Sequence, residues 1–203
     1  MRIRMKPQFR VLGIDDGPFV FSDSRVPIVG VVVRKGYVDS VLRTEADVDG
    51  DDGTSVLARL VLGSGYQDQL AAVMLDGACI GGFNVIDIEE LHRATGLPVL
   101  TVTRDRPDMA RIRAALQKLG SSPKYGRRPV ADWQNRFERL ERTRLVEVRT
   151  GHKPIYMGCA GIAEPEAKGI VTASTIRGAM PEPVRLAHMI ARAFITGSSK
   201  GMD

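Results

Sequence analysis

The order in which strand-like and helix-like segments follow one another limits most strongly what this chain of 203 residues can fold into. Three apolar segments come first, at 10–15, 26–38 and 40–49, and they predict an antiparallel meander. Strand and helix patterns then alternate. The predicted elements are helix 55–64, strand 71–77, helix 83–96, strand 97–103, a helix capped by Asp105, helix 130–143, a hairpin around Thr150-Gly151, and helices near 164–176 and 181–196.

This order predicts an α/β fold whose mixed sheet has three antiparallel strands followed by parallel strands, with helices on its faces. A purely doubly wound fold does not open with a meander, whereas a ribonuclease-H-like arrangement does. A chain of 203 residues is long enough for one domain with a sizeable core, so we expect a single domain over 1–203.

The composition favours a globular protein of the cytoplasm. Hydrophobic residues make up 43% and charged residues 26% of the chain, which are ordinary values. No apolar run approaches the roughly 20 residues that cross a bilayer, and the N-terminus lacks the apolar stretch of a signal peptide. Cys79 and Cys159 are too few for a disulfide framework or a zinc site. We therefore expect no membrane association.

Acidic residues follow the predicted strands at the points where those strands end. Asp15 and Asp16 come after the first strand and Asp76 after the fourth, while the loop after the third contains Asp49 and Asp52. If strands one and four are neighbours, Asp15 and Asp76 emerge at one edge, and an acid of the loop completes a site for Mg²⁺ or Mn²⁺. Paired ions of this kind promote phosphodiester cleavage. The alternative is a set of ordinary strand-end turns and a solvated acidic loop.

Basic residues are dense between Arg104 and Arg149, and the net charge is +5. This distribution is compatible with a nucleic-acid partner, although solvated helices explain it equally well. The candidate phosphate contacts are Arg104, Lys124, Arg127, Arg128 and Lys153. Tyr125 is the aromatic residue among these charges, and it is a candidate for stacking on an unpaired base or for a simple loop anchor.

The last predicted helix has two different faces. Arg185, His188 and Arg192 follow one another at helical spacing and predict a polar stripe. The apolar face consists of Val184, Ala187, Ala191 and Phe194. Arg185 and His188 are candidates for contact with nucleic acid, and His188 is also a candidate for supporting the metal site. The alternative for His188 is a structural position between core and water.

Several stretches together resemble the archaeal endonuclease dU family over about residues 8–197. They are VLGIDDGPF, DVDGDDGTSVLARL, VMLDGACIGGFNVIDIEELHRATGLPVLTVTR and AMPEPVRLAHMIARAFITG. That family is distantly related to endonuclease V, which has a ribonuclease-H-like fold. The resemblance to endonuclease V implies catalytic and metal-binding roles for Asp15 in GIDD and Asp76 in VMLDGACI. It makes Asp52 the best match to the third acid and Asp49 the second choice, with Asp16 as a ligand or close neighbour.

The resemblance implies a metal-dependent DNA endonuclease that cuts near deaminated bases, chiefly deoxyuridine, in DNA repair. Arg104 stands where endonuclease V has a Lys, and nothing in this chain matches the Pro-Tyr wedge of that family. Two alternatives stay open: an endonuclease V-like nuclease directed at inosine or RNA, and a nucleic-acid-binding module of the same fold without catalysis.

Overall fold

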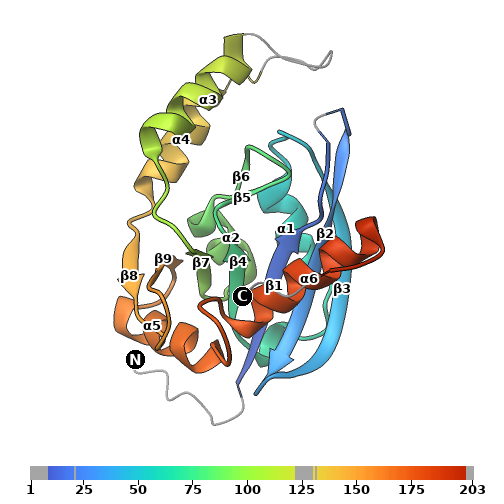
Figure 1. Cartoon of the computed structure of the whole chain (residues 1–203), viewed down its shortest axis with the longest axis vertical. Coiled ribbons are helices and arrows are strands. Elements are labelled where there is room, and N and C mark those ends of the chain that lie inside the picture. The colour runs from blue at the N-terminus through green and yellow to red at the C-terminus, as the bar shows by residue number, and fades with distance from the viewer. Residues whose placement is uncertain (1–8, 21, 122–129, 131, 200–203) are drawn as a thin grey trace.

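The computed structural model describes residues 9–20, 22–121, 130 and 132–199, and its described part contains a seven-stranded sheet with helices on both faces (Figure 1). The strands of this sheet are β1 (Arg10–Asp16), β2 (Arg25–Arg34), β3 (Tyr37–Asp47), β4 (Leu70–Asp76), β7 (Val99–Thr103), β8 (Val146–Val148) and β9 (Ile155–Ala160). The helices are α1 (Gly53–Leu62), α2 (Ile88–Thr95), α3 (Met109–Ser121), α4 (Trp133–Arg142), α5 (Glu164–Ser174) and α6 (Glu182–Thr196), with a 3-10 turn at Gln67–Gln69. No helix in the part of the chain described here is long and apolar enough to cross a membrane.

The strand order in the sheet is β3-β2-β1-β4-β7-β9-β8. Strands β1, β2 and β3 pair antiparallel as a meander, and β4 and β7 then add in parallel to β1. The hairpin of β8 and β9 closes the far side of the sheet antiparallel to β7. The predicted fold class, a meander followed by parallel strands between helices, is confirmed.

Alternating side chains divide the core into two layers. Leu12 and Ile14 of β1 face α1 and α2, whereas Val11 faces the layer that contains α5 and the start of α6. Strand β4 behaves in the same way, since Val73 and Leu75 point to the first layer and Ala72 and Met74 to the second. Both faces are covered, and this explains why the central strands appear in the sequence as continuous apolar runs.

The segment before α2 differs from the prediction of one helix over 83–96. A small hairpin of β5 (Cys79–Ile80) and β6 (Asn84–Val85) comes first, and α2 begins at Ile88. The turn between these strands needs positive φ angles at Gly81 and Gly82. Asp87 then caps α2, because its side chain accepts a hydrogen bond from the Glu90 backbone N–H. The capping signal therefore lay inside the segment predicted as helix.

Helices α3 and α4 pack against each other and form an arm that extends beyond the sheet (Figure 1). The base of the arm is fastened by α4. The buried guanidinium of Arg136 donates to the backbone carbonyls of Asp49 and Phe83 at 2.8 and 2.9 Å. Arg139 forms an ion pair with Asp51 one turn later. Arg136 and Arg139 therefore attach the arm to the acidic loop after β3, and Arg136 also attaches it to the turn between β5 and β6.

Helix α6 lies alongside β1. A Cβ atom on Gly13 would collide with the backbone of Pro183, so only glycine permits this close approach. Ala187 and Ala191 pack on β2, but Phe194 is 66% exposed, and its predicted place on the apolar core face is wrong. The last turn of the helix extends past the part of the sheet that it covers.

Candidate metal centre

Asp15 and Asp76 lie on the same face of the sheet at the carboxyl ends of two neighbouring parallel strands. In the pairing of β1 with β4, Ile14 is opposite Leu75, so the two aspartates come next in register. Side chains alternate along a strand, and both aspartates therefore project from the face that α6 covers. The first and fourth strands are neighbours, which was the condition for this pairing of acids, and their adjacency brings Asp15 and Asp76 together.

His188 of α6 completes the group. Its Nδ1 atom lies 2.7 Å from Oδ2 of Asp15. The ligand atoms of Asp15, Asp76 and His188 all lie within 4.8 Å of one another, which makes them the group of possible metal ligands among the residues described. Asp15 is 6% exposed, while Asp76 and His188 are half-buried.

The environment of the group disfavours negative charge on both aspartates. Burial raises the pKa of Asp15 to about 6, although the hydrogen bond with His188 works in the opposite direction. Burial and the neighbouring charge of Asp15 raise the pKa of Asp76 to about 7, against the lowering effects of His188 and Arg104. The hydrogen bond to Asp15 raises the pKa of His188. A cation at this place would relieve the repulsion between the carboxylates.

The donor set fits a divalent cation. Two carboxylates and an imidazole are within reach of one ion, and carboxylate oxygens are the ligands that Mg²⁺ and Mn²⁺ favour. The partly exposed positions of Asp76 and His188 leave one side of the group accessible from solvent. Such an opening is what a substrate phosphate would need in order to approach the ion.

Asp16 points to the opposite face of the sheet, because it is the next residue after Asp15 in an extended strand. Its Oδ2 atom accepts a hydrogen bond from the Gly81 backbone N–H at 2.5 Å. Burial raises the pKa of Asp16, and the charge of Asp76 contributes to this shift. Asp16 is thus an electrostatic neighbour of the group, and it also holds the β5–β6 hairpin.

Asp49 and Asp52 are engaged with the same hairpin. Asp49 accepts a hydrogen bond from the Phe83 backbone N–H at 2.9 Å. Asp52 accepts from Asn84 Nδ2 at 2.7 Å and from the Asp47 backbone N–H. Neither carboxylate belongs to the group of Asp15, Asp76 and His188. The structure therefore does not bring the two loop acids together with the strand-end acids, as the sequence had led us to expect.

Asn84 is a residue that sequence reasoning missed. It is fully buried, it donates to the carbonyl of Asp47 as well as to Asp52, and its Oδ1 atom accepts from the Gly53 backbone N–H. Its side chain thereby joins the acidic loop, the start of α1 and the β5–β6 hairpin. The only signal in the sequence was a polar residue within an otherwise apolar segment, and that pattern does not indicate its partners.

The predicted phosphate contacts are distributed unevenly. Arg104 follows β7, is exposed, and is close enough to Asp76 to lower the pKa of that carboxyl. Lys153 is exposed in the loop between β8 and β9, and β9 pairs with the end of β7. Both therefore lie near the edge of the sheet that presents Asp76. Four further candidates lie outside the described residues: Lys124, Tyr125, Arg127 and Arg128.

Arg185 has a position that does not suit the predicted contact with nucleic acid. Its guanidinium is buried and forms two hydrogen bonds with the carboxylate of Glu182, at 2.6 and 2.9 Å. A further contact joins its Nη1 atom to the sulfur of Met189. Helical spacing correctly placed Arg185 one turn before His188, but it did not reveal that Glu182 neutralises the charge. Arg185 is a structural residue at the start of α6.

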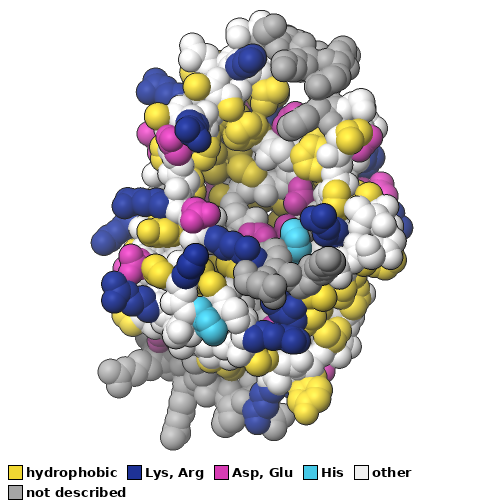
Figure 2. Space-filling model, in the orientation of Figure 1, with side chains coloured by type: hydrophobic (Ala, Val, Ile, Leu, Met, Phe, Trp, Pro, Cys, Tyr) yellow, Lys and Arg dark blue, Asp and Glu magenta, His cyan; other side chains and the backbone are white. Residues whose placement is uncertain are grey.

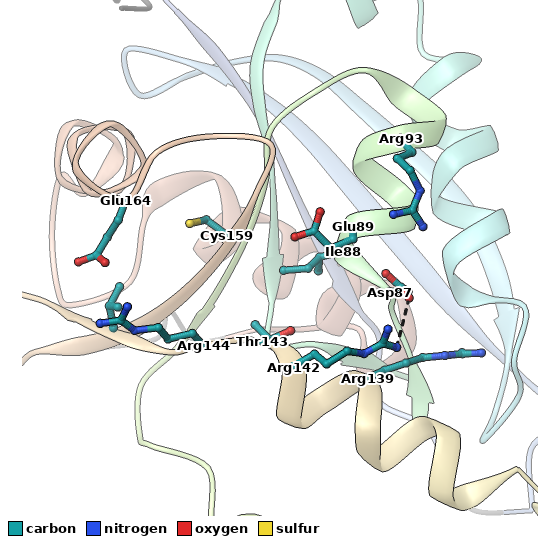
Figure 3. A pocket seen from close by; sticks show the side chains of 11 residues that line it. Asp87, Ile88, Glu89, Arg93, Arg139, Arg142, Thr143, Arg144, Cys159 and Glu164 are labelled. Atoms are coloured by element: carbon teal, nitrogen blue, oxygen red, sulfur yellow. Dashed lines mark ion pairs between the residues drawn. The ribbon is translucent and has the colours of Figure 1, made fainter.

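A cavity of about 320 Å³ lies between α2, α4, β8 and β9, away from the three metal-ligand candidates (Figure 3). Arginines and acids alternate in its wall, and Arg142 pairs with Asp87 at 3.8 Å across it. The wall includes neither Asp15 nor Asp76 nor His188. The group of Asp15, Asp76 and His188 lies at the carboxyl ends of β1 and β4 instead. Figure 2 shows acidic side chains and a histidine in the middle of one face of the molecule, with Lys and Arg side chains around them.

Comparisons with known proteins bear on the family and on the fold. Residues 7–195 match the endonuclease dU family. A UPF0215 protein of Methanothermobacter thermautotrophicus is 43% identical over 98% of this chain and 93% of its own length. A UPF0215 protein of Methanosarcina acetivorans is 44% identical over 97% of this chain and 96% of its own length.

Two solved structures extend the comparison. A protein of unknown function from Archaeoglobus fulgidus is 37% identical, covers 92% of this chain and 98% of its own, and superposes with a TM-score of 0.78. Human endonuclease V is 15% identical, covers 94% of this chain and 85% of its own, and has a TM-score of 0.59. The second likeness shows a shared ribonuclease-H-like fold, and the family assignment supports a nuclease. The chain belongs to the endonuclease dU family.

Proposed function

We propose that this protein is a metal-dependent endonuclease that cleaves DNA phosphodiester bonds near deoxyuridine and so acts in DNA repair. The observation that carries the proposal is the convergence of Asp15, Asp76 and His188 within 4.8 Å at the carboxyl ends of β1 and β4. The family description supports the deoxyuridine specificity.

In this proposal Asp15 and Asp76 hold Mg²⁺ or Mn²⁺, and the imidazole of His188 either contributes a ligand atom or orients Asp15 through their hydrogen bond. A bound ion supplies Lewis-acid stabilisation of the negative charge that develops on the phosphate during cleavage. Asp16, Asp49 and Asp52 keep the β5–β6 hairpin in place beside Asp76. Their direct role as ligands, which the sequence suggested, stays a prediction.

The exposed cations support a nucleic-acid substrate. Arg104 lies within electrostatic reach of Asp76, and its planar guanidinium suits a phosphate group. Lys153 adds a second positive charge on the side of β7 and β9. A Ciona intestinalis endonuclease V, 14% identical and with a TM-score of 0.54, was solved in complex with a DNA containing an inosine followed by a ribo-adenosine. That complex makes inosine and RNA the comparison substrates for this chain.

Cleavage of labelled oligonucleotides tests the proposal. The strands contain one deoxyuridine, one deoxyinosine or neither, in DNA and in RNA form, and each is incubated with Mg²⁺, Mn²⁺ or a chelator. We expect metal-dependent cutting of the deoxyuridine DNA, and a loss of at least about 100-fold in Asp76→Asn. Asp68→Asn is the matched control, because Asp68 is exposed before β4 at the other end of that strand. Binding of every strand without cutting would instead support a non-catalytic module.

A further inference from the structure

The last turn of α6 lies beside the metal centre and extends past the part of the sheet that the helix covers. Going along the helix, Pro183 packs on Gly13, His188 bonds to Asp15, and the last turn reaches Gly17. A Cβ atom on Gly17 would lie 3.3 Å from both the Ala191 carbonyl oxygen and Ile195 Cγ1. The helix therefore follows β1 in the direction of its acidic end and continues beyond it.

Two large apolar side chains are exposed on this turn. Ala187 and Ala191 are fully buried, but Phe194 is 66% and Ile195 51% exposed. Single exposed hydrophobic residues are common on protein surfaces. Here, however, Phe194 and Ile195 are adjacent in the chain. Both lie on the part of α6 that extends past the sheet, beyond the end of β1 that contains Asp15. They offer an apolar surface beyond the acidic end of β1, where Ile195 lies against Gly17, two residues after Asp15.

Arg192 is the charged residue of the same turn. It follows His188 by four residues, so the two side chains are neighbours on the helix. Arg192 is exposed, it has no ion pair with a described residue, and its charge lowers the pKa of His188. We call Arg192, Phe194 and Ile195 the α6 rim.

We propose that the α6 rim binds the nucleic-acid strand next to the metal centre, with Arg192 on a backbone phosphate and Phe194 and Ile195 against unpaired bases. The inference rests on the proposed function, because it takes the nucleic acid as the ligand. Basic and aromatic side chains together are the usual means of holding an unpaired strand. Arg192 lies one turn beyond His188 on α6, whereas Arg104 is close to Asp76 from the end of β7, so in this proposal the strand meets a cation on each side of the carboxylates.

Equilibrium binding in the presence of a chelator tests the rim separately from cleavage. Fluorescently labelled single-stranded DNA and the fully paired duplex are titrated with the full chain at several salt concentrations. We expect Arg192→Ala to weaken the binding of both by about tenfold and to reduce the salt slope by about one. Arg192→Lys should recover most of the affinity. Phe194→Ser should weaken binding of the single strand by about tenfold and that of the duplex much less.

The matched control is Arg59→Ala, which removes an exposed arginine from α1 on the opposite face of the sheet. Equal effects of Arg59→Ala and Arg192→Ala would overturn the phosphate contact. An equal effect of Phe194→Ser on both forms of DNA would overturn the contact with unpaired bases. The rim variants could bind DNA more weakly while the unaltered protein cuts no oligonucleotide in the presence of metal. That result would support the α6 rim as a nucleic-acid-binding surface and would contradict the proposed nuclease activity.

Discussion

His188 Nδ1 lies 2.7 Å from Asp15 Oδ2, although 173 residues separate the two in the chain. The contact connects the last helix to the first strand, and it places an imidazole beside two acids whose pKa values are raised by burial. Each partner supports the charged form of the other. The last helix is therefore part of the candidate site as well as part of the core.

Replacing His188 by Ala should weaken the binding of Mn²⁺ by about 10- to 100-fold, because the change removes either a ligand or the group that orients one. Isothermal titration measures the affinity directly. His152→Ala is the control, since His152 is exposed in the loop between β8 and β9 and should leave the affinity unchanged. Equal affinities of His188→Ala and the unaltered protein would show that the imidazole has no part in holding the ion.

The contribution of Asp15 and Asp76 to the stability of the metal-free protein should fall as the pH rises from about 4 to about 7. The unfolded chain releases the protons of Asp15 and Asp76 near the ordinary aspartate pKa of 3.8, whereas the folded chain holds them until about 6 and 7. The folded state thus binds more protons in this window, so raising the pH favours unfolding. The same groups must lose their protons to bind a cation, so metal affinity should rise over this window.

Asp76→Asn should therefore stabilise the metal-free protein at pH 8 and have little effect at pH 4, where Asp76 is already neutral. A shift of one pKa unit corresponds to about 1.4 kcal/mol, and we expect a gain of roughly 1–3 kcal/mol. Urea unfolding in a chelator, at both pH values, measures the difference. If the gain were the same at pH 4 and pH 8, its cause would not be the titration of this carboxyl.

Asp52 offers a test of the third ligand. The structure engages its carboxylate with Asn84 and the Asp47 backbone, so Asp52→Asn should change the Mn²⁺ affinity less than about threefold. Asp52→Ala should lower the free energy of unfolding by about 1–2 kcal/mol, because buried Asn84 loses a partner. A loss of metal affinity in Asp52→Asn comparable to that of Asp76→Asn would make Asp52 a ligand, as the resemblance to endonuclease V suggests.

Strand periodicity allowed part of the site to be predicted from the sequence. An apolar run followed by an acid indicates where a strand ends, and two such runs in neighbouring parallel strands bring Asp15 and Asp76 together. The same alternation separates Asp15 from Asp16, because consecutive residues point to opposite faces. The partners of a loop acid have no such regularity. Asp49 accepts from the Phe83 backbone and Asp52 from the Asn84 side chain, and residue types alone do not show that these donors of the β5–β6 hairpin lie nearby.

Helical periodicity was similarly informative about positions and uninformative about partners. It placed Arg185, His188 and Arg192 along one side of α6, and it placed Phe194 with Ala187 and Ala191. Where the sheet stops depends on tertiary packing, so the exposure of Phe194 was not predictable. The ion pair that buries Arg185 depends on Glu182 three residues earlier, a spacing that is equally common on solvated helices.

Arg136→Ala should lower the free energy of unfolding by about 2–4 kcal/mol. The change leaves the buried carbonyl of Asp49 and the partly buried carbonyl of Phe83 without their donor and removes the ion pair with Asp132. Arg139→Ala is the matched control from the same helix, and loss of its partly exposed pair with Asp51 should cost less than about 1 kcal/mol. Chemical denaturation gives both values. Similar losses in the two variants would show that Arg136 does not anchor the arm.

Gly13→Ala should disrupt the candidate site without changing any of its ligands. The new methyl group would collide with the backbone of Pro183, so α6 must move away from β1, and His188 moves with it. We expect a loss of stability of about 1–3 kcal/mol from overpacking, together with a loss of Mn²⁺ affinity of at least about tenfold. Gly63→Ala is the control. Gly63 lies at the end of α1 with a negative φ, a conformation that alanine can adopt. The atom nearest to a new Cβ atom there is the Arg59 carbonyl oxygen, at 3.1 Å.

Denaturation and metal titration of both variants separate the two effects. Unchanged metal affinity in a folded Gly13→Ala protein would mean that the close approach of α6 to β1 is not what holds His188 beside Asp15.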